Sequence, residues 1–346
     1  MLWADLVNTP DTPDFPHEDR MHFIGPSGKV WPLRERKLQA LALVAAMARA
    51  GGFFDQWVDK VRHCANLIDT LDWVDGELHY KTVASGFRCK YVLCPVCWLL
   101  QSRKRQFELF ATYQRHAQAH PHDVAVLLTP TFPNAGHRDF PSAVTRLFDG
   151  HRRMTRSKPF QRAVRGWYRT CEAVYNPRRD DFNLHAHYFL LMRPNYGPGA
   201  EIWLDHGAWL KIWRRSMRMP DIKVLHVNRI TNRGEQPAGD PAEAGIAEVT
   251  KYLCKGSSIF SRTTHGFAAD PKVIRTLHEG FFNRRLRAMG GSLKAFAEDI
   301  DFSALERAPT AEKTGEETFM WTTHEALKPG DYLVQNDLDE ASPNGN

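Results

Sequence analysis

Apolar and polar positions along the chain predict helices first and then alternating strands and helices. Apolar residues recur at helical spacing in several segments, and strand-like apolar runs lie between turn-forming residues. The predicted helices are residues 34–64 (with a Gly-Gly break), 98–120, 140–165, 201–218 and 241–256. The predicted strands are residues 123–132, 166–176, 182–192 and 222–230.

The order of these elements indicates an α+β fold. From residue 123 to residue 255 it reads β-α-β-β-α-β-α, which is typical of the split βαβ, ferredoxin-like arrangement. We therefore expect a largely antiparallel sheet with helices on one face. The opposite face would be open to hold a site.

Composition and charge divide the chain into four expected segments. Residues 1–30 are expected to be disordered or loosely packed, 31–120 to be helical with a cysteine-rich segment, 121–300 to form the domain around the sheet, and 301–346 to be an acidic disordered tail. The net charge is −3 for residues 1–30 and −7 for residues 301–346, so that the middle carries +16. A basic body of this kind suits a nucleic-acid partner, although basic surfaces are also common without one. No secretory signal or membrane-spanning run is evident, so we expect a cytoplasmic protein with no membrane partner.

Two histidines lie on one side of the strand predicted over residues 182–192. His185 and His187 are two residues apart, and side chains at that spacing share a strand face. If the preceding strand forms a hairpin with this one, Glu172 lies opposite His185 or His187 on the same face. Two histidines and a carboxylate could hold a divalent metal ion with open coordination positions. Hydrogen-bonded histidines without a metal are the alternative.

The segment "AEVTKYLCKG" places three reactive residues at helical spacing. Glu248 and Tyr252 are four residues apart, and Lys255 follows three residues later. A nearby cation would lower the cost of forming the tyrosine phenolate, and the carboxylate could deprotonate a water molecule. The alternative is an ordinary amphipathic helix with a packed tyrosine ring.

Cysteines cluster between the first helices and the long basic helix. Cys89, Cys94 and Cys97 have the spacing C-x4-C-x2-C, and Cys64 could return as a fourth zinc ligand. His63 is the rival fourth ligand, and a redox-active C-x2-C pair is the other alternative. The site would be structural. The basic residues around it could contact DNA phosphates: Arg88, Lys90, Arg103, Lys104 and Arg105.

Three motifs resemble those of plasmid rolling-circle replication initiators, the Rep proteins of the HUH endonuclease superfamily. They are "LLTPT", "NLHAHYFLLM" and "EVTKYLCKG", and "RCKYVLCPVCWLLQSRKR" resembles the cysteine-rich segment of the branch with one tyrosine and an upstream glutamate. The resemblance covers about residues 60–260. Two positions depart from the family pattern: Pro130 replaces a leucine of the first motif, and Leu184 stands where a proline usually precedes the first histidine. Because proline lacks a backbone donor, we expect the strand that contains Pro130, residues 123–132, to be bulged or at an edge.

The resemblance implies a mechanism and a set of partners. His185 and His187 would bind Mg²⁺ or Mn²⁺, Tyr252 would be the nicking nucleophile, and Glu248 would activate water in termination. Nicking would leave a 3′-hydroxyl primer and a 5′-phosphotyrosine. The implied partners are plasmid origin DNA, as duplex and as exposed single strand, with a host helicase and polymerase; a homo-oligomer is also compatible.

Two other classes of protein remain open. An HUH transposase or relaxase is one, although relaxases generally place the tyrosine before the histidines and the related transposases often carry two tyrosines. A non-enzymatic, zinc-containing DNA-binding regulator is the other.

Overall fold

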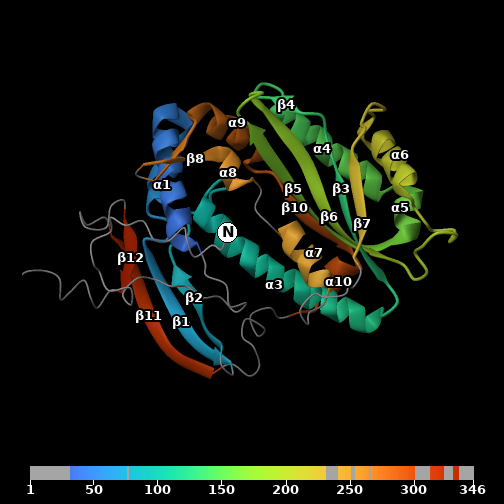
Figure 1. Ribbon diagram of the computed structural model, residues 1–346, viewed down its shortest axis with the longest axis horizontal. Coiled ribbons are helices and arrows are strands. Elements are labelled where there is room, and N and C mark those ends of the chain that lie inside the picture. The colour runs from blue at the N-terminus through green and yellow to red at the C-terminus, as the bar shows by residue number, and fades with distance from the viewer. Residues whose placement is uncertain are drawn as a thin grey trace, which may run out of the picture. The chain divides into compact units, whose positions relative to one another are not determined.

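The computed structural model describes residues 32–75, 78–230, 241–250, 254–264, 266–300, 312–322 and 330–334, and these belong to two compact units (Figure 1). Unit 1 is formed from residues 1–97, 260–269 and 304–346, and unit 2 from residues 98–259 and 270–303. No helix in these described ranges is long and apolar enough to cross a bilayer.

Unit 1 combines helices with a four-stranded antiparallel sheet. Its helices are α1 (Leu33–Ala50), the 3-10 turn η3 (Gly52–Phe54) and α2 (Asp55–Arg62). The sheet has the order β12-β11-β1-β2, with β1 (Leu67–Asp75), β2 (Leu78–Gly86), β11 (Glu312–Thr322) and β12 (Asp331–Val334). A separate hairpin is formed by β8 (Phe260–Thr263) and β9 (Gly266–Ala269). The predicted break between the first helices is confirmed, with positive φ angles at Gly51 and Gly52.

This sheet corrects two expectations from the sequence. Residues 31–120 are not only helical, because β1 and β2 form a hairpin within them. Residues 301–346 are not a disordered tail throughout, because β11 pairs with β1 from Leu67 opposite Met320 to Val74 opposite Glu312. Lys81 bridges the carboxylates of Asp72 and Glu317, which compensates part of the acidic charge that had indicated disorder.

Unit 2 is built on an antiparallel sheet with the order β10-β5-β6-β3-β7. Its main strands are β3 (Val124–Pro130), β5 (Val164–Asn176), β6 (Asp181–Met192), β7 (Leu225–Arg229) and β10 (Arg287–Gly291), with a short β4 (Ala135–Gly136) beside β6. The order of β5, β6, β3 and β7 is that of the split βαβ arrangement, and β10 extends it at one edge. β3 is an interior strand rather than an edge, and Pro130 is its last residue, opposite Leu225.

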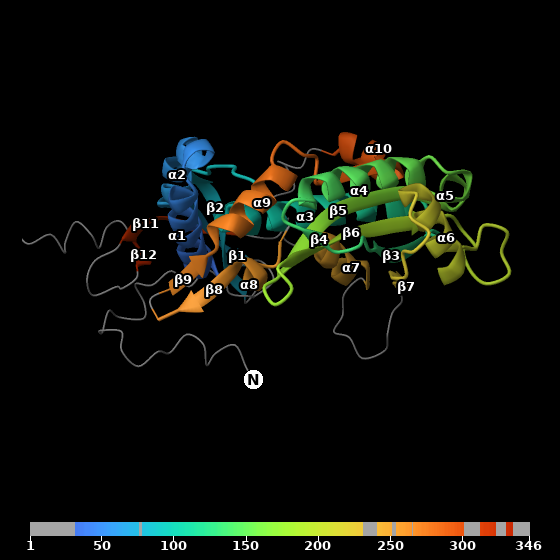
Figure 2. The same cartoon turned by 90° about the horizontal axis from the view of Figure 1, so that it is seen from above.

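Helices cover both faces of this sheet rather than one. The helices of unit 2 are α3 (Pro95–Ala119, which starts in unit 1), α4 (Phe140–Thr155), α5 (Lys158–Ala163), α6 (His206–Met217), α7 (Pro241–Thr250), α8 (Gly256–Ile259), α9 (Pro271–Phe281) and α10 (Ser292–Glu298). Phe189 and Leu191 pack in one cluster with residues of α3, α7 and α10. On the other face, the ring of Phe182 lies 4.7 Å from that of Phe140 of α4. Figure 2 shows α4 on one side of the strands β5 and β6 and α7 on the other.

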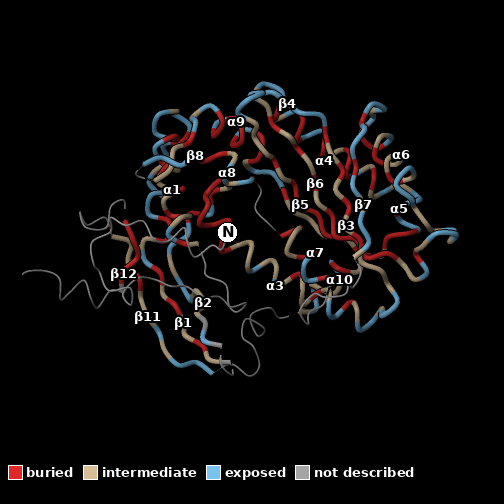
Figure 3. Tube along the Cα trace, viewed as in Figure 1, coloured by how far each residue is buried: buried red, intermediate tan, exposed pale blue. Residues whose placement is uncertain are grey.

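The burial pattern of β6 explains why helices cover both faces of the sheet. Residues 188–192 are buried without alternation, so this part of the strand is apolar on both sides and needs two covering layers (Figure 3). Towards the start of the strand the pattern alternates, and His185 and His187 are only half-buried. The alternating end of β6 is where polar side chains can gather.

Helix α7 is shorter than the sequence predicted. Its described bounds are Pro241–Thr250, and the Thr250 hydroxyl donates to the Ile246 carbonyl at 2.8 Å. Cys254 instead forms a parallel bridge with Ala173 of β5, and Lys255 follows as an exposed residue outside the helix. Pairing with the sheet therefore overrides the helical pattern, and the expectation that Lys255 shares a helix with Glu248 is wrong.

Candidate metal centres and nucleic-acid-processing site

The β5–β6 hairpin brings three potential metal ligands together. Glu172 lies directly opposite His185 in the antiparallel register, and Thr170 lies opposite His187. His185 and His187 share one face because they are two residues apart. The predicted position of Glu172, opposite a histidine of the pair in the hairpin, is confirmed.

The three side chains converge on a single carboxylate oxygen. Glu172 Oε2 lies 3.2 Å from His185 Nε2 and 2.9 Å from His187 Nε2. The imidazole rings are 4.7 Å apart and nearly perpendicular, at 83°. Each residue offers one ligand atom, and these atoms all lie within 4.8 Å of one another. Such a set of nitrogen and oxygen donors fits a divalent metal ion.

Hydrogen bonds on the far side of each ring fix the orientation of the histidines. His185 Nδ1 lies 3.0 Å from Asn183 Oδ1, and His187 Nδ1 lies 3.2 Å from Thr129 Oγ1. Asn183 is in turn held by Asn134, whose Oδ1 accepts from Asn183 Nδ2 at 3.1 Å. Because the Asn183 oxygen can accept the Nδ1–H of His185, it orients the ring, and a metal ion bound at Nε2 would replace the hydrogen bond that Nε2 makes to Glu172. The sequence analysis missed Asn183 and Thr129, although Asn183 has the same two-residue spacing from His185.

The environment keeps the carboxyl group ionised. Burial alone would raise the pKa of Glu172, but hydrogen bonds from His185 and His187 outweigh it and lower the pKa to about 2. The side chains of His185 and His187 are 13% and 12% exposed, so the site is reachable from solvent at one side. The site therefore presents a negative charge and two imidazole nitrogens to an incoming cation.

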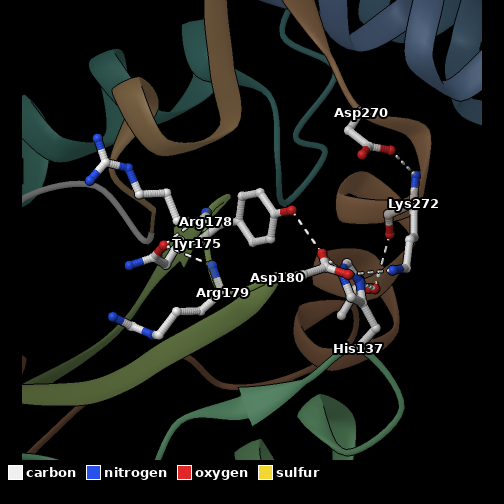
Figure 4. Close-up of polar contacts among 9 residues, drawn as sticks. His137, Tyr175, Arg178, Arg179, Asp180, Asp270 and Lys272 are labelled. Carbon is white, nitrogen blue, oxygen red and sulfur yellow. Dashed lines mark hydrogen bonds and ion pairs between the residues drawn. The ribbon is translucent and has the colours of Figure 1, made fainter.

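The tip of the hairpin is braced by a second polar cluster (Figure 4). Asp180, which has a positive φ of 52°, accepts from Tyr175 Oη at 2.8 Å and from Lys272 Nζ at 2.7 Å. His137 Nε2 also lies 2.7 Å from the Asp180 carboxylate. Figure 4 shows the Arg178 side chain directed away from this cluster. The cluster ties the hairpin to α9 and to the segment before α4, which holds the two strands of the site in register.

Only part of the predicted catalytic helix can be placed. Glu248 is half-buried on α7, whose residues Ile246 and Val249 pack on the sheet face that carries the histidines. Tyr252 lies outside the described residues. Its neighbour Cys254 is fully buried beside Ala173, and burial, followed by the nearby Glu172 charge, raises the pKa of its thiol. Lys255 is exposed one residue further on.

A second cluster in unit 1 consists of four buried cysteines. Cys64 Sγ lies 3.6 Å from Cys97 Sγ and 3.7 Å from Cys94 Sγ, and Cys89 Sγ lies 3.7 Å from Cys97 Sγ. These distances exclude disulfide bonds, which require about 2.05 Å. His63, the rival ligand, is exposed and bonds to Asp59 instead. The structure thus brings Cys64 to the other three cysteines.

A buried lysine lies beside the cysteine cluster. Lys37 Nζ donates to the Cys64 carbonyl at 2.7 Å, to the Arg62 carbonyl at 2.8 Å and to Asn66 Oδ1 at 2.5 Å. Burial lowers the pKa of Lys37 to about 8, while the thiols of the cluster act in the opposite direction. Sulfhydryl donation, first from Cys89, lowers the pKa of Cys64 well below its usual range. The cluster is therefore arranged to hold at least one thiolate next to a cation, and no pattern in the sequence had indicated Lys37.

The basic residues predicted to contact DNA differ in exposure. Arg88 and Lys90 are exposed in unit 1, and Lys104 is exposed on α3 in unit 2, where it lies 4.0 Å from Glu108. Arg103 and Arg105 are half-buried, and one terminal nitrogen of Arg105 is buried without a hydrogen-bond partner in the described structure. Their contact with DNA stays a prediction.

Comparison with known proteins gives a consistent class. A family described as "Replication protein" matches residues 80–327. A "Protein rep" of Streptococcus pneumoniae is 22% identical over 280 residues, which cover 81% of this chain and 82% of the relative. A "Protein rep" of Lactiplantibacillus plantarum is 24% identical over 318 residues, covering 90% and 96%. One from Staphylococcus aureus is 24% identical over 200 residues, covering 58% and 82%.

The fold, the site and these matches define a protein that initiates replication. The family match includes both strands of the histidine site and the whole of α7. The chain belongs to the replication protein family of plasmid replication initiators. No solved structure matches it.

Proposed function

We propose that this initiator starts rolling-circle replication by nicking and rejoining one strand of plasmid origin DNA through Tyr252, as an HUH endonuclease does. The observation that carries the proposal is the convergence of Glu172, His185 and His187 on one point of the sheet. Two imidazole nitrogens and a carboxylate oxygen that meet at one place on a strand pair are a ligand set that suits a divalent ion. A metal-assisted phosphate site gives them a common purpose.

The chain's own residues prepare this site. A divalent ion bound there, Mg²⁺ or Mn²⁺, would draw negative charge from a non-bridging oxygen of the scissile phosphate. His185 and His187 would hold it through Nε2, and Glu172 through a carboxylate oxygen. Asn183 and Thr129 keep the rings turned toward the site, which reduces the entropy lost on binding.

Tyr252 is the proposed nucleophile. It stands two residues before Cys254 in the sequence. Cys254 forms a bridge with Ala173, the residue after Glu172. The phenol oxygen would form a bond to phosphorus, and the bond from phosphorus to the 3′ oxygen would break. The products are a 3′-hydroxyl and a 5′-phosphotyrosine.

Glu248 and Lys255 are assigned supporting roles. Glu248 would accept a proton from a water molecule that attacks the phosphotyrosine, so that the bond from the tyrosine oxygen to phosphorus breaks in termination. The positive charge of Lys255 would stabilise the phenolate. Lys255 follows Cys254 and lies outside α7, so it would act from outside the helix. Neither role depends on the two residues sharing a helix face.

The four cysteines fit a structural zinc ion. Zinc–sulfur bonds of about 2.3 Å in a tetrahedron place sulfur atoms about 3.8 Å apart. The measured sulfur distances of 3.6–3.7 Å are close to this value. Four cysteine ligands would fill the tetrahedral coordination of the zinc ion, which leaves no open position for a substrate.

A nicking assay tests the proposal. Purified protein is incubated with a supercoiled plasmid that carries the replicon encoding it, with Mg²⁺ or with EDTA, and relaxed product is measured. We expect relaxation that EDTA abolishes, and that His185→Ala and Tyr252→Phe abolish while duplex binding is kept. Glu248→Ala should still nick but accumulate unterminated product.

The controls separate the rival classes. Tyr168→Phe is the matched tyrosine control, because the Tyr168 hydroxyl has no hydrogen-bond partner in the described structure, and it should relax plasmid at close to the native rate. A non-enzymatic regulator would bind the plasmid without relaxing it under any condition, and that result would overturn the proposal. Relaxation that survives Tyr252→Phe would remove Tyr252 from the mechanism.

A further inference from the structure

Helix α6 carries an apolar stripe and a basic stripe on different sides. Trp209 and Trp213 are fully buried. Lys211, Arg215 and Arg218 are exposed, and they follow one another at spacings of four and three residues, the last at the helix C-cap. Lys211 and Arg215, four residues apart, lie on one side of the helix, and Arg218 follows at the C-cap; these three cations are here called the α6 stripe.

The buried side of α6 fixes the direction of the stripe. Trp213 Nε1 donates to the Thr131 carbonyl at 2.9 Å, and Trp209 Nε1 donates to the Tyr196 hydroxyl at 3.0 Å. At the start of the helix, Asp205 accepts from the Ala208 amide at 2.6 Å and caps it. The helix is therefore held by specific bonds, and the cations opposite the tryptophans must face solvent.

The charge of the stripe is not compensated. Among the residues that the structure describes, Lys211, Arg215 and Arg218 form no ion pair. Residues 206–223 contain five Lys and Arg and one acidic residue, Asp221. Like charges four residues apart destabilise a helix, although two of the three cations gain from lying near its C-terminus. A basic stripe on one side of a helix is typical of a surface that binds a polyanion.

Helix α4 adds to the same surface. An added Cβ at Gly150 would come within 1.9 Å of Met217 Sδ, so the glycine allows the ends of α4 and α6 to approach closely. Arg153 bonds to the Ser216 carbonyl at this contact. The segment that ends α4 and continues through α5, residues 151–163, contains five Lys and Arg and no acidic residue. Arg156 is exposed, three residues after Arg153.

The surface lies on the sheet face opposite the metal ligands. His185 and His187 alternate with Phe182 and Tyr188, and the latter two contact residues of α4. α4 therefore covers the side of the sheet away from Glu172 and the histidines (Figure 2), and α6 packs against α4. A ligand on the α6 stripe would leave the metal ligands accessible.

We propose that the α6 stripe binds the phosphate backbone of duplex DNA. The inference rests on the proposed function, in which duplex origin is held while one strand reaches the site. Seven residues of helix span about 10 Å, comparable with the major-groove width of about 12 Å. A single strand is the less suitable ligand, because proteins that bind it use exposed aromatic rings and both α6 tryptophans are buried.

The test measures binding to a fluorescein-labelled duplex of 30 base pairs and arbitrary sequence, by anisotropy at several salt concentrations. The variant is Lys211→Gln/Arg215→Gln. We expect affinity at least about 10-fold lower near 0.15 M salt and a salt slope smaller by about 1.8, because each lost phosphate contact removes about 0.9. The matched control, Lys60→Gln/Arg62→Gln, removes the same two charges from exposed positions of α2 and should bind as the native protein does.

Cleavage of a pool of single-stranded oligonucleotides that together cover both strands of the replicon separates this inference from the proposed function. We expect the native protein and the Lys211→Gln/Arg215→Gln variant to cut the pool equally. Duplex binding unchanged in that variant, or reduced equally in the α2 control, would overturn the α6 assignment. An equal loss of single-strand binding would also overturn it. If no protein cuts the pool, the proposed function fails, while duplex binding still decides the α6 stripe.

Discussion

At the residue scale, the function proposed for this chain depends on how two imidazole rings are turned. His185 Nδ1 is held by Asn183, and His187 Nδ1 by Thr129, so that both Nε2 atoms face Glu172. Outer partners of this kind fix the tautomer and direction of a metal-binding histidine. The site is therefore preorganised before any ion binds.

Asn183→Ala should weaken metal binding without unfolding the protein. The substitution frees the His185 ring to rotate and to change tautomer, so we expect Mn²⁺ affinity to fall by about 10- to 100-fold. Calorimetric titration with Mn²⁺ measures this directly and needs no DNA. Asn228→Ala, at an exposed position of β7, is the matched control. Equal affinities for Asn183→Ala and the native protein would remove Asn183 from the site.

Individual residues also show how far the sequence could predict this site. The position of Glu172 was predictable because the residue numbers of opposed residues in a hairpin add up to a constant. The turn between the two strands was evident from the sequence. Asn183 was missed because an asparagine in a strand has many ordinary roles. Lys255 was misplaced because the helical pattern continues past Thr250, while the chain leaves the helix to pair Cys254 with Ala173.

At the element scale, the cysteine cluster joins separate pieces of unit 1. Cys64 follows α2, Cys89 follows β2, and Cys94 and Cys97 lie at the start of α3. Zinc held by all four would fix these elements to one another in a way that a small core alone does not. The spacing of three cysteines was readable from the sequence, whereas the return of Cys64 depends on the intervening β1–β2 hairpin, which no strong pattern predicted.

Cys94→Ala should therefore remove zinc and destabilise the protein. We expect the bound zinc, measured by elemental mass spectrometry, to fall from one ion per chain to none, and the Tm to fall by about 10 °C because ligand binding free energy is lost from folding. Cys171→Ala replaces an equally buried cysteine of β5 outside the cluster and should keep its zinc. Full zinc content in the Cys94 variant would contradict a four-cysteine site.

At the scale of the whole molecule, two sheets are assembled from distant parts of the chain. β11 pairs with β1 across more than two hundred residues, and its acidic sequence gives no apolar alternation to predict that pairing. The sheet of unit 2 was easier to predict, because its strands carry long apolar runs and follow one another closely. Its second helical layer was missed because the consecutive burial of residues 188–192 has to be read as a strand covered on both sides.

Buried histidines should make the protein lose stability as the pH falls. Burial, followed by the charges of Arg169 and Arg152, lowers the pKa of His151 to about 3, and burial lowers that of His278 to about 4. Between about pH 6.5 and these values, the unfolded chain binds protons that the folded protein does not. As the pH falls through this range, the free energy of unfolding therefore decreases by up to about 1.4 kcal/mol per pH unit for each histidine. The loss is complete once the pH is below the pKa of the histidine in the folded protein.

Denaturant unfolding at pH 4 to 7 measures this slope. His151→Gln should reduce the slope between pH 4 and pH 6 by about 1.4 kcal/mol per pH unit, because one proton-linked group is removed. The exposed His122→Gln serves as the control for loss of a histidine. An unchanged slope in the His151 variant would show that this histidine is not kept neutral by the fold.

Mass spectrometry of the covalent peptide–DNA adduct tests the central claim most directly. Native protein is incubated with Mg²⁺ and origin DNA, trapped before termination, digested, and the peptide that carries the nucleotide is sequenced. The account predicts a nucleotide attached through its 5′ phosphate to Tyr252, formed with Mg²⁺ and absent with EDTA or in His185→Ala. An adduct on any other residue, or one that forms equally well without the metal ion, would contradict it.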